Sequence, residues 1–179
     1  IRYLTFYAFS TENWNRPESE VSAIMNLLDS YLKNCLKLAK KNNMRVRVIG
    51  DVSRLDEEFQ KNIRKLETAS AGYTGLNLQI AINYGSRDEM IRAMKHMIQE
   101  HDEGKLAIED IDESKFASYL DTAGIPDPDL MIRTSGEQRL SNYLLWQLAY
   151  SEFYFTDVPW PDFDEAELKR AVEAYSSRD

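Results

Sequence analysis

The sequence contains little that would stabilise its fold covalently or carry it across a membrane. It has one cysteine in 179 residues, so no disulfide can form within the chain. It contains no run of about 18 or more apolar residues, which is the pattern of a membrane-spanning helix. No secretory signal is visible either. These absences predict a protein of a reducing compartment, which we expect to be cytoplasmic.

Several catalytic and binding signatures are missing as well. There is no Walker phosphate loop, no Gly-x-Gly-x-x-Gly, no Cys-x-x-Cys and no serine elbow. The two histidines, His96 and His101, fall on different faces of a helix and do not predict a metal pair. Basic residues number 22 against 30 acidic ones, for a net charge of −8. That balance argues against nucleic acid as a partner but leaves room for a local anion pocket.

What is present is an alternation of apolar strands and amphipathic helices. The length fits a single domain, with 43% hydrophobic and 29% charged residues. Because the helices are long enough for crossovers, the pattern predicts an α/β fold with a mostly parallel central sheet flanked by helices on both faces. We expect strands at about 2–9, 44–49, 76–83 and 130–132, one more strand ending near 155, and helices at about 17–41, 55–70, 88–100, 113–120 and 164–176.

Polar loops follow three of the predicted strands. In parallel sheets, ligands bind outside the carboxyl ends of the strands. The segments Ser10–Arg16, Asn83–Arg87 and Arg133–Ser141 are therefore expected to converge on one edge of the sheet. This inference turns scattered polar residues into one candidate site.

The third of these loops carries two arginines around a Thr-Ser-Gly turn. The guanidinium groups of Arg133 and Arg139 match phosphate oxygens. Ser141 stands where a helix N-cap is expected, and free N–H groups at a helix start attract anions. A carboxylate such as Glu152 could hold Mg²⁺ beside bound phosphates. The same residues also suit an ordinary surface loop with a capping serine, and this stretch alone leaves both interpretations open.

Five segments, in chain order, resemble signature motifs of the cis-prenyltransferases, most closely those of the bacterial undecaprenyl diphosphate synthases. The resemblance covers essentially the whole chain and implies one cis-prenyltransferase catalytic domain over residues 1–179. The segments are Phe9–Pro17 (FSTENWNRP), Asn83–Arg87 (NYGSR), Ile132–Glu137 (IRTSGE), Arg139–Asn142 (RLSN) and Glu152–Asp157 (EFYFTD).

The resemblance also implies a reaction. Isopentenyl diphosphate would be condensed repeatedly with farnesyl diphosphate, with Mg²⁺ as cofactor, to give a long-chain undecaprenyl diphosphate for the cell-wall lipid carrier. Asn13 with Ser10 would assist proton removal, and Glu152 would help to bind Mg²⁺. The substrate-binding residues would be Ser10, Thr11, Glu12, Trp14 and Arg16, together with Arg133, Arg139, Leu140 and Ser141 for the isopentenyl diphosphate.

For two sets of residues, the sequence does not distinguish a structural role from contact with the substrate. Trp14 could be a structural anchor or a substrate contact. Five apolar positions could line a tunnel for the growing chain or simply pack in the core. They are Ala8, Ile24, Leu27, Leu76 and Leu78.

The resemblance further implies a homodimer, and an apolar product predicts transient contact with a membrane surface. We expect the chain to be an excerpt, with the family's Asp-Gly-Asn loop before Ile1 and an Arg- and Gly-containing tail after Asp179, and to be nearly inactive alone. The alternatives are a non-catalytic scaffold subunit of a heteromeric cis-prenyltransferase and a phosphate-binding module without turnover. The enzyme is favoured because the residues of the active pattern are present: Asn13, Arg16, Arg133, Arg139, Ser141 and Glu152.

Overall fold

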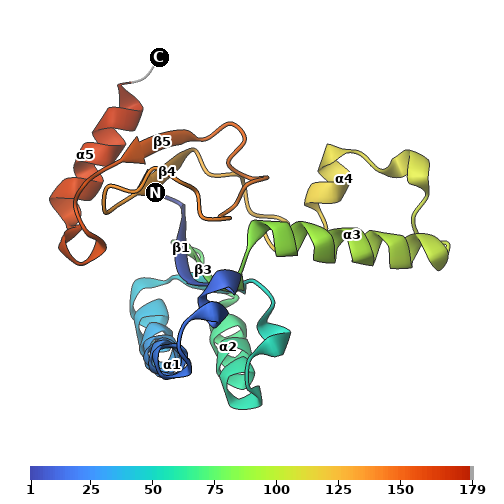
Figure 1. Ribbon diagram of the computed structural model, residues 1–179, viewed down its shortest axis with the longest axis horizontal. Helices are drawn as coiled ribbons and strands as arrows, with labels where there is room; N and C mark the ends of the chain where they lie inside the picture. The colour runs from blue at the N-terminus through green and yellow to red at the C-terminus, as the bar shows by residue number, and fades with distance from the viewer. Residues whose placement is uncertain (178–179) are drawn as a thin grey trace. The chain divides into compact units, whose positions relative to one another are not determined.

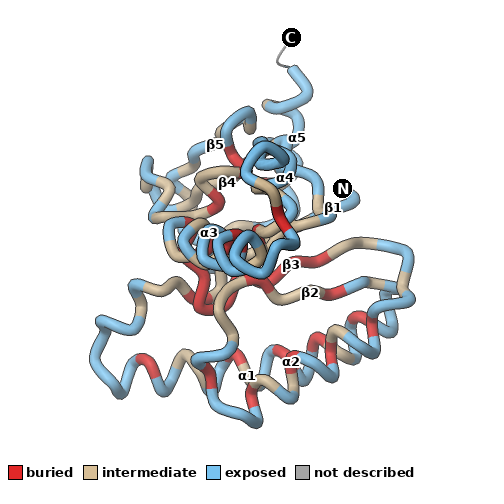
Figure 2. Tube along the Cα trace, turned by 90° about the vertical axis from the view of Figure 1, so that its right-hand side faces the viewer, coloured by how far each residue is buried: buried red, intermediate tan, exposed pale blue. Residues whose placement is uncertain are grey.

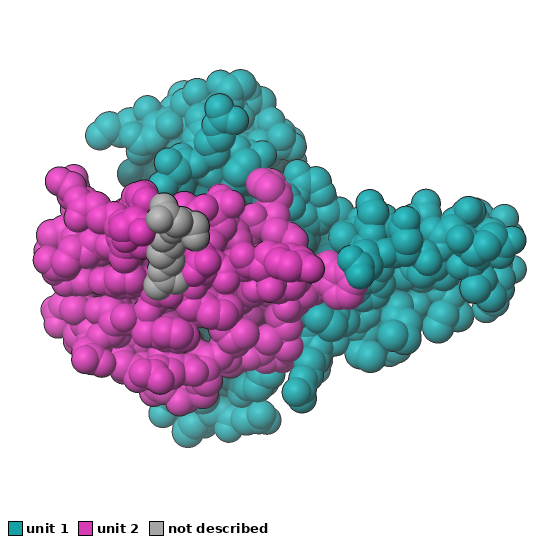
Figure 3. All heavy atoms as spheres, turned by 90° about the horizontal axis from the view of Figure 1, so that it is seen from above, with its two compact units in different colours: residues 1–125 teal, residues 126–179 magenta. Residues whose placement is uncertain are grey.

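A computed structural model describes residues 1–177 of the chain. The chain divides into two compact units, Ile1–Ile125 and Pro126–Asp179, which Figure 3 colours teal and magenta. Each unit is described by itself. The single catalytic domain expected over the whole chain stays a prediction.

The first unit alternates strands and helices as the sequence predicts (Figure 1). Every expected element is present, with ends moved by a few residues, and short 3-10 turns add to the loops. The elements are β1 (Tyr3–Ser10), η1 (Thr11–Asn15), α1 (Glu18–Asn42), β2 (Arg45–Ile49), η2 (Val52–Arg54), α2 (Glu57–Ser70), β3 (Asn77–Tyr84), α3 (Ser86–Asp102), η3 (Ile108–Asp110) and α4 (Glu113–Ala117).

The three strands of this unit form a parallel sheet in the order β1-β3-β2. Asn77 at the start of β3 pairs with both Tyr3 and Arg45, so β3 is central. All of β3 after Asn77 is buried, as Figure 2 shows in red. A central parallel strand covered on both faces is expected to be apolar along its length. The pairing confirms the predicted α/β class with parallel strands.

Helices α1 and α2 lie side by side against one face of this sheet (Figure 1). Their apolar faces form one core with Leu78, Ile80 and Ile82 of β3. Cys35 is 1% exposed in that core, and burial raises the pKa of its thiol. The one cysteine of the chain is therefore a buried core thiol. Core packing accounts for Leu78, while Leu27 is 71% exposed and does not belong to this core.

The second unit consists of a two-stranded parallel sheet, a long loop and a helix. It contains β4 (Leu130–Arg133), β5 (Glu152–Phe155), η4 (Trp160–Asp162) and α5 (Glu165–Ser176). Leu130 pairs with Glu152 and Arg133 with Phe155. The side chain of Asp164 caps α5 by accepting from the N–H of Glu167. Within the described residues 1–177, no helix combines the length and the apolarity that crossing a bilayer requires.

The helix that the sequence predicts after Ser141 does not form. Residues 141–150 run through turns and bends instead. Ser141, Asn142 and Leu144 have φ values of 50, 61 and 46°, in the left-handed region. An N-cap residue is extended and the following residues are right-handed, so Ser141 cannot cap a helix here. Leu144 and Leu148 are nevertheless buried, at the four-residue spacing on which the helix was predicted.

Candidate active site

The carboxyl ends of β1 and β3 bring two of the three predicted loops together. Ser10, the last residue of β1, pairs with Tyr84, the last residue of β3. The loop after β2 joins the same edge, because the N–H of Asp51 donates to the carbonyl of Asn83 over 3.1 Å. The predicted meeting of Ser10–Arg16 with Asn83–Arg87 is therefore confirmed. The third loop lies in the second unit, and its meeting with the first two stays a prediction.

Trp14 is anchored at this edge. Its indole Nε1 donates to Oδ1 of Asn83 over 2.7 Å. Its ring meets the ring of Phe9 edge-on, with centroids 5.1 Å apart. These contacts support the anchor interpretation of Trp14, although 38% of the residue remains exposed.

Asn13 in η1 and Ser10, which caps the start of η1, are joined by a local hydrogen bond. The backbone N–H of Ser10 donates to Oδ1 of Asn13 over 2.9 Å. A carbonyl oxygen has two lone pairs, so Oδ1 keeps one acceptor site beyond this bond. The neighbouring polar groups form an exposed rim: Thr11 Oγ1 donates to Glu12 over 3.1 Å, and Arg16 pairs with Glu20 at 3.4 Å. The rim is open to solvent and suits contact with a charged ligand.

A buried polar network supports the edge, and the sequence analysis did not identify it. The carboxylate of Glu89 in α3 is 1% exposed and accepts from the hydroxyl of Tyr84 at 2.5 Å and from the N–H of Asp121 at 2.9 Å. Asp121 in turn accepts from the N–H of Gly50 and from Arg92. Burial and the Glu89 carboxylate raise the pKa of Tyr84, so its phenol stays protonated and donates.

Arg133 closes β4 and presents an unsatisfied donor. Among the described residues, its buried Nε has no hydrogen-bond partner. Its backbone carbonyl is occupied, because it accepts from the N–H of Thr156 over 2.9 Å. Buried guanidinium donors are almost always paired, so an unpaired one makes Arg133 a candidate for binding a ligand. This donor fits an anion such as a phosphate.

The rest of the Thr-Ser-Gly loop offers side chains rather than backbone N–H groups. The N–H groups of Ser135 and Gly136 already donate to the carbonyls of Val158 and Thr156, at 2.9 and 3.0 Å. Because Ser141 does not start a helix, the anion-attracting helix end expected there is absent. Arg139 is 68% exposed at its side chain and pairs with Glu137. An exposed ion pair of this kind is worth only about 0–1 kcal/mol, so a phosphate could displace Glu137.

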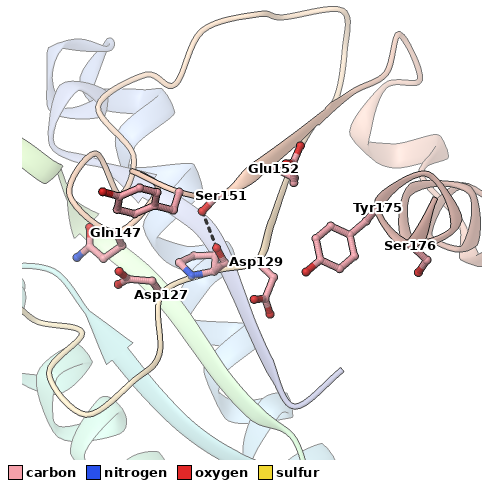
Figure 4. Close-up of a pocket in the computed structure, with 9 residues that line it drawn as sticks. Asp127, Asp129, Gln147, Ser151, Glu152, Tyr175 and Ser176 are labelled. Atoms are coloured by element: carbon pink, nitrogen blue, oxygen red, sulfur yellow. Dashed lines mark hydrogen bonds between the residues drawn. The ribbon is translucent and has the colours of Figure 1, made fainter. Parts of the chain in front are cut away.

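Glu152 opens β5 and lies on a pocket within the second unit (Figure 4). The pocket has a volume of about 560 Å³, and Asp127, Asp129 and Tyr175 line it as well. The N–H of Glu152 donates to the carbonyl of Asp129 over 2.9 Å. In the parallel register Glu152 lies three residues from Arg133, or about 10 Å along the strands. The two side chains therefore belong to opposite ends of the β4–β5 pair.

The donor set fits magnesium as a partial site. Glu152 supplies hard oxygen ligands and is exposed. No group of three His, Cys, Asp or Glu residues placed to hold a metal ion occurs in residues 1–177. Mg²⁺ is commonly held by one or two carboxylates, with substrate phosphates and waters completing the shell. One carboxylate is therefore compatible with Mg²⁺ that arrives together with a diphosphate.

Comparisons with known proteins agree with the residue pattern. A sequence model described as a putative undecaprenyl diphosphate synthase family matches residues 1–179. The isoprenyl transferase of Clostridium perfringens is 50% identical over 179 residues, which cover 100% of this chain and 71% of that protein. The isoprenyl transferase of Agrobacterium fabrum is also 50% identical, over 100% of this chain and 72% of its own.

Two solved structures extend the likeness to the backbone. A lavandulyl diphosphate synthase from Lavandula x intermedia, in complex with dimethylallyl diphosphate, has a TM-score of 0.95 and 38% identity, covering 100% of this chain and 78% of that one. A probable undecaprenyl diphosphate synthase from Campylobacter jejuni has a TM-score of 0.89 and 40% identity, covering 100% and 82%. The chain therefore belongs to the undecaprenyl diphosphate synthase family of prenyltransferases.

Proposed function

We propose that this prenyltransferase condenses isopentenyl diphosphate with farnesyl diphosphate and repeats the step to form undecaprenyl diphosphate, the lipid carrier precursor of cell-wall synthesis. Membership of the family supports cis-prenyl chain elongation. The observation that carries the substrate assignment is the buried, unpaired Nε of Arg133 in the described chain. Arg133 ends strand β4, and the loop that follows carries a second arginine, Arg139. A guanidinium group in this place suits a diphosphate oxygen.

The proposed reaction begins when the allylic diphosphate leaves and an allylic cation develops. The double bond of isopentenyl diphosphate attacks that cation, and a proton is then lost to restore a double bond in the product. Arg133, Arg139 and Ser141, with Leu140 beside them, hold the diphosphate of isopentenyl diphosphate. Fixed positive charge near departing or bound phosphates stabilises the transition state electrostatically.

Proton removal is assigned to Asn13 with Ser10. Neither side chain is a strong base, so their role is to orient and relay the proton, which passes to an oxygen of the diphosphate that has left the allylic substrate. The hydrogen bond from Ser10 N to Asn13 Oδ1, at 2.9 Å, holds the amide in one orientation. The exposed rim of Thr11, Glu12 and Arg16 is assigned to substrate binding.

Magnesium is assigned to Glu152, whose carboxylate would provide one oxygen ligand. When bound, the ion neutralises charge on a diphosphate.

We also propose that the protein forms a homodimer and makes transient contact with a membrane surface. A half-exposed apolar stripe on α3, formed by Ile91, Met94 and Ile98, supports a protein interface. The apolar polyprenyl product supports the membrane contact.

The Glu152→Gln variant is expected to require about tenfold more Mg²⁺ for half-maximal activity, because a neutral amide is a weaker ligand than a carboxylate. The measurement is a titration of activity with Mg²⁺ in the full-length protein. Glu173→Gln on α5 is the matched control, since Glu173 is an exposed carboxylate of the same unit that does not line the pocket. An unchanged Mg²⁺ midpoint in Glu152→Gln would exclude Glu152 as a ligand.

The proposed function is tested by incubating the full-length protein with radiolabelled isopentenyl diphosphate, farnesyl diphosphate and Mg²⁺. We expect radiolabel in a butanol-extractable polyprenyl diphosphate, with a ladder of lengths on thin-layer chromatography after removal of phosphate. The longest major band reports the product length. If the folded protein binds isopentenyl diphosphate but forms no extractable product, it is a scaffold subunit or a binding module instead.

A further inference from the structure

Asn83 and Trp14 form a link across the carboxyl edge of the first unit's sheet that the roles assigned above do not explain. Asn83 is fully buried, at 0% exposure. Its Oδ1 accepts from Trp14 Nε1, and its Nδ2 donates to the carbonyl of Asp51, each over 2.7 Å. Through one side chain, the loops that follow β1 and β2 are tied to the end of β3. Both ends of a buried amide are satisfied, which is the condition for a rigid polar contact.

The backbone at this point is held in an unusual conformation. Asn83 has a φ of 48°, in the left-handed region that asparagine tolerates better than most residues. Its carbonyl also accepts from the N–H of Asp51 at 3.1 Å, so the loop after β2 contacts Asn83 twice. Strained residues persist only where the surroundings over-determine them, and they cluster at functional sites.

The link rests on the buried network beneath it. The N–H of Gly50, beside Asp51, donates to Oδ2 of Asp121 over 3.0 Å. The N–H of Asp121 donates to the buried carboxylate of Glu89 over 2.9 Å. The loop after β2 therefore connects the contact between Trp14 and Asn83 to helix α3 through partly buried hydrogen bonds.

The geometry points to Asn83 and Trp14 as positioning residues for Asn13, an inference that rests on the proposed function. Trp14 follows Asn13 directly within η1, so fixing the indole fixes the turn that carries the Asn13 amide. Asn13 is held from its other side by the N–H of Ser10. The link thus sets where the Asn13 amide lies, and Trp14 acts as an anchor.

The test uses Asn83→Gly, Trp14→Phe and the double variant in the full-length protein. Glycine accepts the positive φ but removes the side-chain bonds, while phenylalanine keeps a ring against Phe9 and removes the indole N–H. Each single variant is expected to lower kcat by on the order of 10- to 100-fold, because small misplacements of reacting groups are costly. The KM for isopentenyl diphosphate should stay within about twofold.

The double variant is expected to behave like Asn83→Gly alone, because both changes remove the same hydrogen bond. Trp160→Phe is the control, since Trp160 belongs to the second unit and is 56% exposed. Losses that multiply in the double variant, or single variants with wild-type kcat, would overturn the inference. If Asn83→Gly does not fold, Trp14→Phe, a change at a partly exposed residue, still decides it through kcat.

A second readout does not depend on activity. Hydrogen exchange of the Trp14 indole N–H, assigned in NMR spectra by its disappearance in Trp14→Phe, should be slow in the wild type and fast in Asn83→Gly. Equal protection in both would overturn the link. If the wild type forms no product, the proposed function fails, while this measurement still reports on the contact between Trp14 and Asn83.

Discussion

Replacing Arg133 with alanine is expected to lower kcat/KM for the condensation by about 100- to 1,000-fold and to leave the fold intact. Removing one preorganised donor that stabilises transition-state charge typically costs about this much in rate. Each charged hydrogen bond is worth about 1.5–3 kcal/mol, and 1.36 kcal/mol corresponds to about tenfold. Among the described residues, the buried Nε of Arg133 has no partner whose loss would destabilise the loop.

The measurement is steady-state kinetics with isopentenyl diphosphate as the varied substrate, alongside thermal unfolding. Arg170→Ala is the matched control, because Arg170 lies on α5 in the same unit, where it forms an ion pair with Glu167. It should change kcat/KM by less than about twofold. An Arg133→Ala protein that unfolds at the wild-type temperature and keeps near-normal kcat/KM would refute the diphosphate assignment.

The largest expected effect on stability is that of Gly50→Ala. A Cβ at Gly50 would lie 2.0 Å from the carbonyl oxygen of Ile82 and 3.0 Å from that of Asn83, and the φ of +118° is one that L residues rarely adopt. Backbone strain of this kind costs about 1–3 kcal/mol, and overpacking about 1–3 kcal/mol more. We expect the free energy of unfolding to fall by roughly 2–6 kcal/mol, measured by urea denaturation.

Gly72→Ala is the matched control for this experiment. Gly72 follows α2 in the same unit, and a Cβ there would meet no atom within 4 Å. The substitution should therefore change the free energy of unfolding by less than about 0.5 kcal/mol. Equal stability of the Gly50→Ala and Gly72→Ala proteins would mean that the close approach of the loop after β2 to the end of strand β3 is not required for the fold.

The regular elements were readable from the sequence because their signals are local. Hydrophobic periodicity located α1 and α2. The apolar run at 76–83 predicted the strand β3, which lies at the centre of the sheet. The sheet-edge rule then placed Ser10–Arg16 beside Asn83–Arg87, which the register of Ser10 with Tyr84 confirms. These inferences needed only periods and loop order.

The loop after Arg133 was not readable in the same way. The apolar run after Ser141 has the spacing of an amphipathic helix. In the structure Leu144 is buried with a φ of 46°, so tertiary packing overrides the local preference for a helix. The contact between Trp14 and Asn83 joins residues that are 69 positions apart, so no local pattern indicates it. The buried carboxylate of Glu89 was missed because acidic residues in the first turn of a helix are usually exposed.

The strand order β1-β3-β2 has a consequence for how the first unit is made. Among the described residues, the first strand pairs with a strand that is made much later in the chain, since the hydrogen-bonded Thr5 and Gln79 are 74 residues apart. At ribosomal rates of about 5–20 residues per second, that partner follows after roughly 4–15 seconds. Helix α1 can order locally during that time, whereas β1, whose Leu4 and Phe6 pack against the core, must wait unpaired. Strand β2 also pairs with β3, but it is made later than β1, so its wait is shorter. During synthesis, β1 is thus the segment of this unit that most needs protection from premature association.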